Sequence, residues 1–117
     1  MGRLTTHVLD TANGRPAAGV RLTLYRNAGE RYMLIGDDVT NQDGRCDRPL
    51  LEGDAFTSGR YRLVFAACEY FAKAGTALPD PPFIDEVVVD FGVADAASHY
   101  HVPLLVSPWS FSTYRGS

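Results

Sequence analysis

The sequence has few of the residues that would mark a metal site, a membrane span or a disulfide scaffold. Only two cysteines occur among its 117 residues, and the separation of Cys46 and Cys68 fits no metal-binding spacing. We expect both to be reduced thiols that pack as small apolar side chains. No apolar run approaches the ~20 residues that cross a bilayer, and residues 1–7 lack the long apolar stretch of a secretory signal. These absences predict a cytoplasmic protein without a membrane partner.

An excess of positive charge is also missing. Lys and Arg number 11 against 14 Asp and Glu, which gives a formal net charge of −3. Proteins that bind nucleic acid or anionic membrane surfaces normally draw their affinity from basic faces, so we expect neither partner. With 45% hydrophobic and 21% charged residues, the chain has a globular composition, and residues 1–117 are long enough for one domain.

Short segments with strand character recur along the chain and are separated by turn residues. Turn signals stand at residues 13–16 and 41–44, and the good helix formers at 67–74 are followed by Gly75, a residue suited to a helix end. The predicted strands are residues 5–10, 20–25, 32–35, 45–51, 60–66, 86–91, 98–106 and 109–114. The pattern predicts an all-β sandwich or barrel of about eight strands with one short helix.

The three histidines are the first candidates for chemistry. His7 lies in the first predicted strand, and His99 and His101 lie two residues apart in the penultimate one, where they point to the same face. Three imidazoles could supply the nitrogen ligands of a zinc ion. They could instead act as acids and bases, because imidazole titrates near neutral pH, or they could be solvent-exposed strand residues. Spacing alone leaves these three interpretations open.

The C-terminal residues form a second unusual feature. Chain ends commonly fray into polar tails, whereas residues 110–117 keep strand character and carry hydroxyl groups, Tyr114 and Arg115 to the end. This segment could also be an edge strand that Arg115 and Gly116 protect from aggregation.

Four motifs, taken together, resemble those of the transthyretin-related 5-hydroxyisourate hydrolases. They follow one another in the order found in that family and span residues 4–117. The motifs are LTTHVLD with GRPA (4–10 and 14–17), TNQDGR (40–45), HYHVPLL with SP (99–105 and 107–108) and STYRGS (112–117). The last of these ends in the tetrapeptide that separates the hydrolases from transthyretin itself.

The resemblance implies a fold and a reaction. The fold is a transthyretin-like β-sandwich of two four-stranded sheets with a short helix, which agrees with the strand pattern. The reaction is the hydrolytic opening of 5-hydroxyisourate, the product of urate oxidation, to a ureidoimidazoline carboxylate, without a metal or cofactor. A transthyretin-like carrier of small ligands without catalysis is the alternative. A carrier has no need of the histidines, Arg45 or the terminal tetrapeptide.

Matching by motif, the resemblance implies a catalytic set of His7, Arg45, His101 and Ser117, with His7, Arg45 and Tyr114 contacting the substrate. Such a reaction needs a base for water, a group that holds the developing oxyanion and a proton for the departing nitrogen. The two histidines can share the acid–base work, and the guanidinium of Arg45 suits carbonyl oxygens of a flat substrate. Ser117 would relay a proton or position water.

Three further residues bear on the shape and the surroundings of this site. His99 points to the same side as His101 and receives at most an outer supporting role. Trp109 and Phe111 stand where many members of the family have tyrosines, which affects the expected pocket shape.

The expected assembly follows from where the site residues must lie. Because the interior of a sandwich is filled by apolar side chains, the site residues should project from the outer face of one sheet. Pairing two such faces across a symmetry axis would turn a shallow surface into a channel, and the last strand could pair with another subunit at its edge. Together with the resemblance, this predicts a homotetramer with its sites at a subunit interface.

Overall fold

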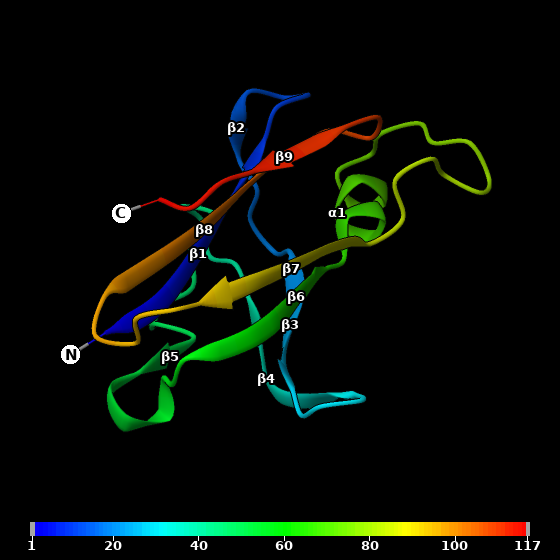
Figure 1. Cartoon of the computed structure of the whole chain (residues 1–117). Coiled ribbons are helices and arrows are strands. Elements are labelled where there is room, and N and C mark those ends of the chain that lie inside the picture. Colours follow the sequence, from blue (N-terminus) through cyan, green and yellow to red (C-terminus); the bar gives the residue numbers. More distant parts are fainter. Residues whose placement is uncertain (1, 117) are drawn as a thin grey trace.

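The computed structural model describes residues 2–116, whose strands form two β-sheets packed face to face (Figure 1). The elements in chain order are β1 (Arg3–Asp10), β2 (Arg15–Pro16), β3 (Arg21–Asn27), β4 (Tyr32–Val39), β5 (Leu51–Glu52), the short 3-10 helix η1 (Gly53–Ala55), β6 (Gly59–Phe65), α1 (Ala67–Lys73), β7 (Val87–Val93), β8 (His99–Val106) and β9 (Phe111–Thr113). The predicted all-β, two-sheet sandwich with one short α-helix is confirmed for this part of the chain, although one sheet has five strands instead of the four that the resemblance implied.

The two sheets differ in how their strands are joined. One has the order β4-β3-β6-β7, and all its pairs are antiparallel. The other has the order β2-β1-β8-β9, with β5 also paired to β1. Its central strands β1 and β8 are parallel over eight residue pairs, from Arg3 opposite His99 to Asp10 opposite Val106. Segments from the two ends of the sequence therefore lie side by side at the centre of this sheet (Figure 1).

The core between the sheets is filled by apolar side chains from alternate strand positions. Along β1, Leu4 and Val8 are buried, whereas Thr5 and His7 point to the outer face and are half-buried. The other sheet contributes buried side chains such as Leu22 and Phe65. This alternation follows from the period of two residues in a strand, and it leaves Thr5 and His7 on the outer surface of β1.

The end of β1 is fixed by the buried carboxylate of Asp10. Its two oxygens accept hydrogen bonds from the backbone and side-chain nitrogens of Asn13, at 2.9 and 2.7 Å. The hydroxyl of Tyr70 in α1 also donates to Asp10, at 2.7 Å. The last residue of the LTTHVLD motif therefore orders the turn after β1 and attaches the helix to the sheet that carries the outward-facing histidines.

The prediction of a strand over residues 45–51 was wrong for most of its length. Only Leu51–Glu52 forms a strand there, and Arg45 makes a single bridge to His7. Pro49 lacks the N–H that a continuous ladder needs, so residues 45–50 run as a loop beside β1. The last strand is also shorter than predicted, because Ser107 and Ser110 close a turn in which the Ser107 N–H donates to the Ser110 carbonyl at 2.9 Å. Among residues 2–116, no helix is long and apolar enough to span a bilayer.

Candidate active site

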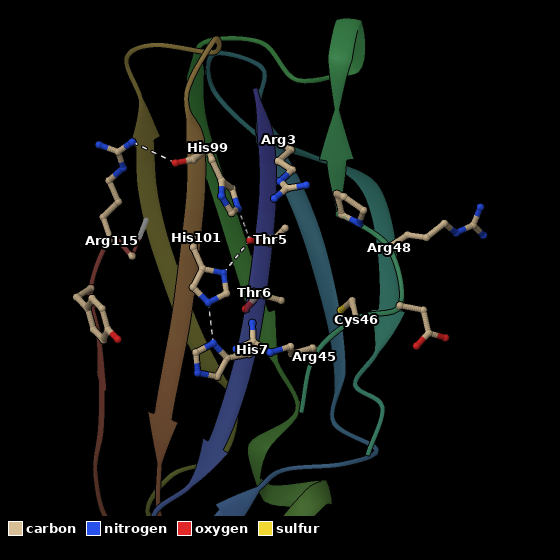
Figure 2. Close-up of a pocket in the computed structure, with 14 residues that line it drawn as sticks. Arg3, Thr5, Thr6, His7, Arg45, Cys46, Arg48, His99, His101 and Arg115 are labelled. Carbon is tan, nitrogen blue, oxygen red and sulfur yellow. Dashed lines mark hydrogen bonds between the residues drawn. The ribbon is translucent and has the colours of Figure 1, made fainter. Parts of the chain in front are cut away.

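A pocket of about 680 Å³ lies on the outer face of the sheet that contains β1 and β8 (Figure 2). Its volume falls within the usual range for small-molecule sites, roughly 300–1,000 Å³. The described residues that line it are Arg3, Thr5, Thr6, His7, Arg45, Cys46, Asp47, Arg48, Pro49, His99, His101, Tyr114, Arg115 and Gly116. All the described members of the predicted site set are therefore brought together in one place.

The floor of the pocket is built by the parallel pairing of β1 and β8. Their register places Thr5 opposite His101 and Arg3 opposite His99. Because alternate residues share a face, His7 joins Thr5 on the outer surface of β1, and the two histidines of β8 join each other beside them. Two motifs more than 90 residues apart thus form one surface.

Four of these side chains form a continuous row of hydrogen-bonded groups (Figure 2). The Thr5 hydroxyl lies 2.7 Å from His99 Nε2 and 2.7 Å from His101 Nδ1. The other nitrogen of His101, Nε2, lies 2.6 Å from His7 Nδ1, and these two rings are stacked with centroids 4.9 Å apart. Both ring nitrogens of His101 are therefore occupied. Among residues 2–116, His7 Nε2 and His99 Nδ1 have no hydrogen-bond partner, and of these two rings only that of His7 is influenced by the charge of Arg45.

Arg45 reaches the pocket from a tight turn that precedes it. The backbone N–H of Gly44 donates to the Asn41 carbonyl at 2.9 Å, and the N–H of Val8 in β1 donates to the Gly44 carbonyl at 2.8 Å. Gly44 has a φ of +74°, and a Cβ added to it would lie 2.4 Å from the Val8 carbonyl oxygen. The glycine of the TNQDGR motif is therefore required for the close approach that places Arg45 beside His7.

The C-terminal segment closes another side of the pocket. The N–H of Gly116 donates to the His101 carbonyl at 2.7 Å, and a Cβ on this glycine would lie 3.0 Å from Cδ2 of the His101 ring. Arg115 stacks over the buried ring of Tyr100 at 4.0 Å and donates to the His99 carbonyl at 3.2 Å. Tyr114 lines the pocket and is 60% exposed. Ser117, which the sequence placed in the catalytic set, lies outside the described residues.

The surroundings of the histidines disfavour their protonation. Burial, followed by repulsion from His7, Arg45 and His99, lowers the pKa of His101 to about 4. Burial and the nearby guanidinium of Arg45 lower the pKa of His7 as well. At neutral pH both rings are therefore neutral, so that each carries one N–H and one bare nitrogen. A bare nitrogen on His7 can act as a base.

The pocket is positively charged although the whole chain is negative. Its lining includes four arginines and one acidic residue, Asp47, whereas the complete sequence has a formal net charge of −3. Guanidinium groups are donors suited to carbonyl and carboxylate oxygens. The arrangement therefore favours a small, oxygen-rich ligand that is negatively charged or becomes so during a reaction.

The imidazoles do not surround a common point where a metal ion could sit. They are arranged in a row, and their facing nitrogens are joined by the hydrogen bonds described above. Within residues 2–116, no group of three His, Cys, Asp or Glu side chains is placed to hold a metal ion. The geometry therefore offers acid–base chemistry rather than the three nitrogen ligands that the histidine spacing had left open.

Thr5 lines the pocket between His99 and His101, and the sequence analysis had assigned it no role. It stands in the LTTHVLD motif two residues before His7, so the strand period alone would have placed it on the same face. Its partners in β8 could not be identified in this way, because the parallel register of β1 and β8 is a long-range feature.

Comparison with known proteins adds independent observations. A model of the HIUase/Transthyretin family matches residues 4–116. A Rhizobium meliloti protein named 5-hydroxyisourate hydrolase 2 is 60% identical over 116 residues, which cover 99% of this chain and 97% of the relative. A Pseudomonas aeruginosa 5-hydroxyisourate hydrolase is 56% identical over 117 residues, which cover 100% of this chain and 93% of the relative.

Solved structures show the same architecture. An (S)-allantoin synthase matches with a TM-score of 0.94 and 52% identity over 99% of this chain, although the match covers 44% of that longer protein. The 5-hydroxyisourate hydrolase of Klebsiella pneumoniae matches with a TM-score of 0.82 and 33% identity over the whole of both chains. Sea bream transthyretin in complex with thyroxine matches with a TM-score of 0.86 and 28% identity, over 97% of this chain and 94% of its own. The sandwich is therefore transthyretin-like.

Proposed function

The chain belongs to the HIUase/Transthyretin family, and on this premise we propose that it hydrolyses 5-hydroxyisourate to a ureidoimidazoline carboxylate. The observation that carries the proposal is the row of neutral imidazoles with Arg45 at its end, in a pocket of small-molecule size. Relatives with 54–60% identity over nearly the whole chain bear the name 5-hydroxyisourate hydrolase, which supports the same activity.

His7 is the base in this proposal because its Nε2 has no hydrogen-bond partner among residues 2–116 and its ring lies beside Arg45. It takes a proton from a water molecule, whose oxygen then attacks a ring carbonyl of the substrate. His101 contacts His7 directly at 2.6 Å, so the positive charge that forms on the pair is shared between the two rings. When the tetrahedral intermediate collapses, the C–N bond breaks and the proton passes to the departing nitrogen, so that one water is consumed.

Arg45 stabilises the negative charge that develops on the attacked carbonyl oxygen. Its fixed positive charge also adds to burial, the larger cause, in lowering the pKa of His7, so that this ring stays neutral. Tyr114 lies at the edge of the pocket, where its hydroxyl can contact the substrate. Ser117 is retained as a residue that relays a proton or positions water, on the basis of the motif alone.

A carrier without catalysis is the competing function, since transthyretin itself shares the fold. A hydrophobic ligand would be best served by an apolar pocket, whereas this one is lined by four arginines and three histidines. The polar lining and the names of the similar full-length relatives both favour hydrolysis.

The direct test generates 5-hydroxyisourate from urate with urate oxidase and follows the decay of its ultraviolet absorbance. We expect the purified protein to accelerate this decay well beyond the spontaneous rate and to release one proton per substrate. Decay at the spontaneous rate would contradict the proposed function.

We also propose that the protein is a homotetramer whose sites lie at a subunit interface. In the part of the chain described, β7 and β9 each pair on one side only, so both offer an open edge. Outside the set of residues that line the pocket, Trp109 in the turn after β8 stacks with Phe83, with centroids 6.2 Å apart; they are 61% and 71% exposed, and Phe111 is also exposed. Such an apolar patch is typical of a contact surface.

Sedimentation and activity measured over the same dilution series test this assembly. We expect activity to fall in step with dissociation, because the open pocket would lose its opposing wall. A fully active monomer would contradict the interface site. The cytoplasmic location stays a prediction, and fractionation of the source cells would test it.

A further inference from the structure

The single proton of the Thr5 hydroxyl limits the directions that the hydrogen bonds between Thr5 and its neighbouring histidines can take. This oxygen lies 2.7 Å from His99 Nε2 and 2.7 Å from His101 Nδ1. Because a threonine hydroxyl has one hydrogen, it donates to one of these nitrogens and accepts an N–H from the other. An arrangement in which both rings donate would leave the Thr5 O–H without an acceptor among residues 2–116.

The row can therefore run in two directions when all three rings are neutral. In the first, Thr5 donates to His99 Nε2, His101 Nδ1–H donates to Thr5, and His7 Nδ1–H donates to His101 Nε2. In the second, every one of these hydrogen bonds is reversed. The first direction leaves His7 Nε2 bare and able to act as a base, whereas the second places a proton on it.

We propose that Thr5 and His99 are positioning residues that hold the row in the first direction and so keep His7 in its basic tautomer. This inference rests on the proposed hydrolysis, and it assigns His99 a role that needs no contact with the substrate. His99 is the final acceptor of the row. Because Thr5 donates to His99, it must accept from His101 Nδ1–H, and His101 Nε2 is then bare and accepts from His7 Nδ1–H.

The surroundings of His99 keep it neutral, which the accepting state requires. Burial, the guanidinium of Arg3 on β1 and that of Arg115 after β9 all lower the pKa of His99, so the ring stays neutral near pH 7. On its own strand it faces His101, with ring centroids 6.2 Å apart, and that ring also resists protonation. A neutral His99 can present a bare Nε2 to the Thr5 hydroxyl.

Protonation of His99 at lower pH would reverse the row. A protonated ring donates from Nε2 to Thr5, whose hydroxyl then donates to His101 Nδ1, and His101 donates to His7. Binding of a proton at His99 thus moves the proton of His7 from Nδ1 to Nε2, which switches off the base while the His7 ring stays neutral. His7 and His101, together with the positive charge of Arg45 that faces both rings, contribute their own titration to the same acidic limb.

Two substitutions of Thr5 separate the effect of its hydroxyl from the effect of its side-chain shape. Thr5→Val keeps the branched side chain but removes the hydroxyl, and Thr5→Ser restores it. We expect kcat of Thr5→Val to fall roughly tenfold or more, with KM changed little, and Thr5→Ser to remain close to the wild type. Thr23→Val is the matched control, because Thr23 occupies an outward-facing position on β3 in the other sheet.

Nitrogen-15 NMR of the histidines reads the direction of the row without using any substrate. In the wild type near pH 7 we expect bare nitrogens at His7 Nε2, His101 Nε2 and His99 Nε2. In Thr5→Val we expect His7 and His101 to become mixtures of both tautomers. This measurement would still decide the inference if the protein failed to accelerate 5-hydroxyisourate decay, an outcome that would defeat only the proposed function.

A pair of variants at His99 tests the acceptor role and does not depend on how Thr5→Val folds. The amide oxygen of His99→Gln can accept the Thr5 hydroxyl but does not titrate, whereas His99→Leu removes the acceptor. We expect His99→Leu to lose roughly tenfold in kcat. We expect His99→Gln to stay near the wild type at pH 7 and to keep its activity to a lower pH.

Several outcomes would overturn the inference while leaving hydrolysis intact. One is wild-type kcat and unchanged tautomers in Thr5→Val, and another is equal loss in Thr5→Val and Thr5→Ser. Full activity in His99→Leu, or an acidic limb in His99→Gln that coincides with the wild type, would show that His99 does not direct the row.

Discussion

Replacing Gly44 by alanine should both destabilise the protein and displace Arg45. Gly44 has a φ of +74°, a conformation that costs an L-residue about 1–2 kcal/mol. The added Cβ would lie 2.4 Å from the Val8 carbonyl oxygen, so the turn must move away from β1. That movement breaks the hydrogen bond from the Val8 N–H to the Gly44 carbonyl, at 2.8 Å, which contributes about 1 kcal/mol. We therefore expect the free energy of unfolding to fall by about 2–3 kcal/mol.

Gly14→Ala is the matched control for this substitution. Gly14 has a similar φ of +66°, but nothing lies within 4 Å of an added Cβ. It should show the conformational cost alone, about 1–2 kcal/mol, with kcat unchanged. In Gly44→Ala the displaced turn carries Arg45 away from His7, so kcat should fall by roughly tenfold or more in addition to the loss of stability.

Urea unfolding and the 5-hydroxyisourate decay assay together measure both effects. For a domain of this size, the loss expected for Gly44→Ala corresponds to a fall in Tm of roughly 10 °C. The activity assay is run well below that transition, so that unfolded protein does not contribute. If the two alanine variants show the same stability and the same kcat, the close approach of Gly44 to β1 has no energetic or positional effect and the reasoning is refuted.

Three other predictions follow from the same site. Arg45→Ala should lower kcat roughly 10²-fold through loss of oxyanion stabilisation, whereas Arg60→Ala, on an exposed position of β6, should not; equal kinetics would remove Arg45 from the mechanism. The folded-state pKa of His101, about 4, lies below its ordinary value of 6.5, so the unfolded chain binds more protons between these values. In urea titrations, the free energy of unfolding should therefore be highest above pH 6.5 and fall as the pH is lowered toward 4. His101→Gln should weaken this decline. Gly116→Ala would place a Cβ 3.0 Å from the His101 ring and should lower kcat several-fold with Tm nearly unchanged, so a wild-type kcat would show that the C-terminal segment can shift without moving the ring.

Most of the sandwich could be predicted because strand patterns are local. In β1, β3 and β6, apolar and polar residues alternate with the period of two that a half-buried strand imposes, and the predicted segments 5–10, 20–25 and 60–66 each overlap the observed strand. The loop at residues 45–50 was wrongly predicted as a strand, although Pro49 lacks the N–H that a continuous ladder needs. Its single bridge, between Arg45 and His7, depends on a neighbouring strand and could not be identified from the local pattern.

The candidate site divides in the same way. The sequence alone determined which residue types were available, and the strand period placed His7 on one outer face and His99 and His101 together on another. Only the tertiary structure decided that these faces are one surface, because the parallel pairing of β1 and β8 joins residues 94 to 96 positions apart. That register put the Thr5 hydroxyl between two imidazoles and brought His101 against His7. The chemistry of a side chain follows from its residue type. The distances that let one imidazole influence the proton position of another are set by long-range strand pairing and by the packing of the whole core.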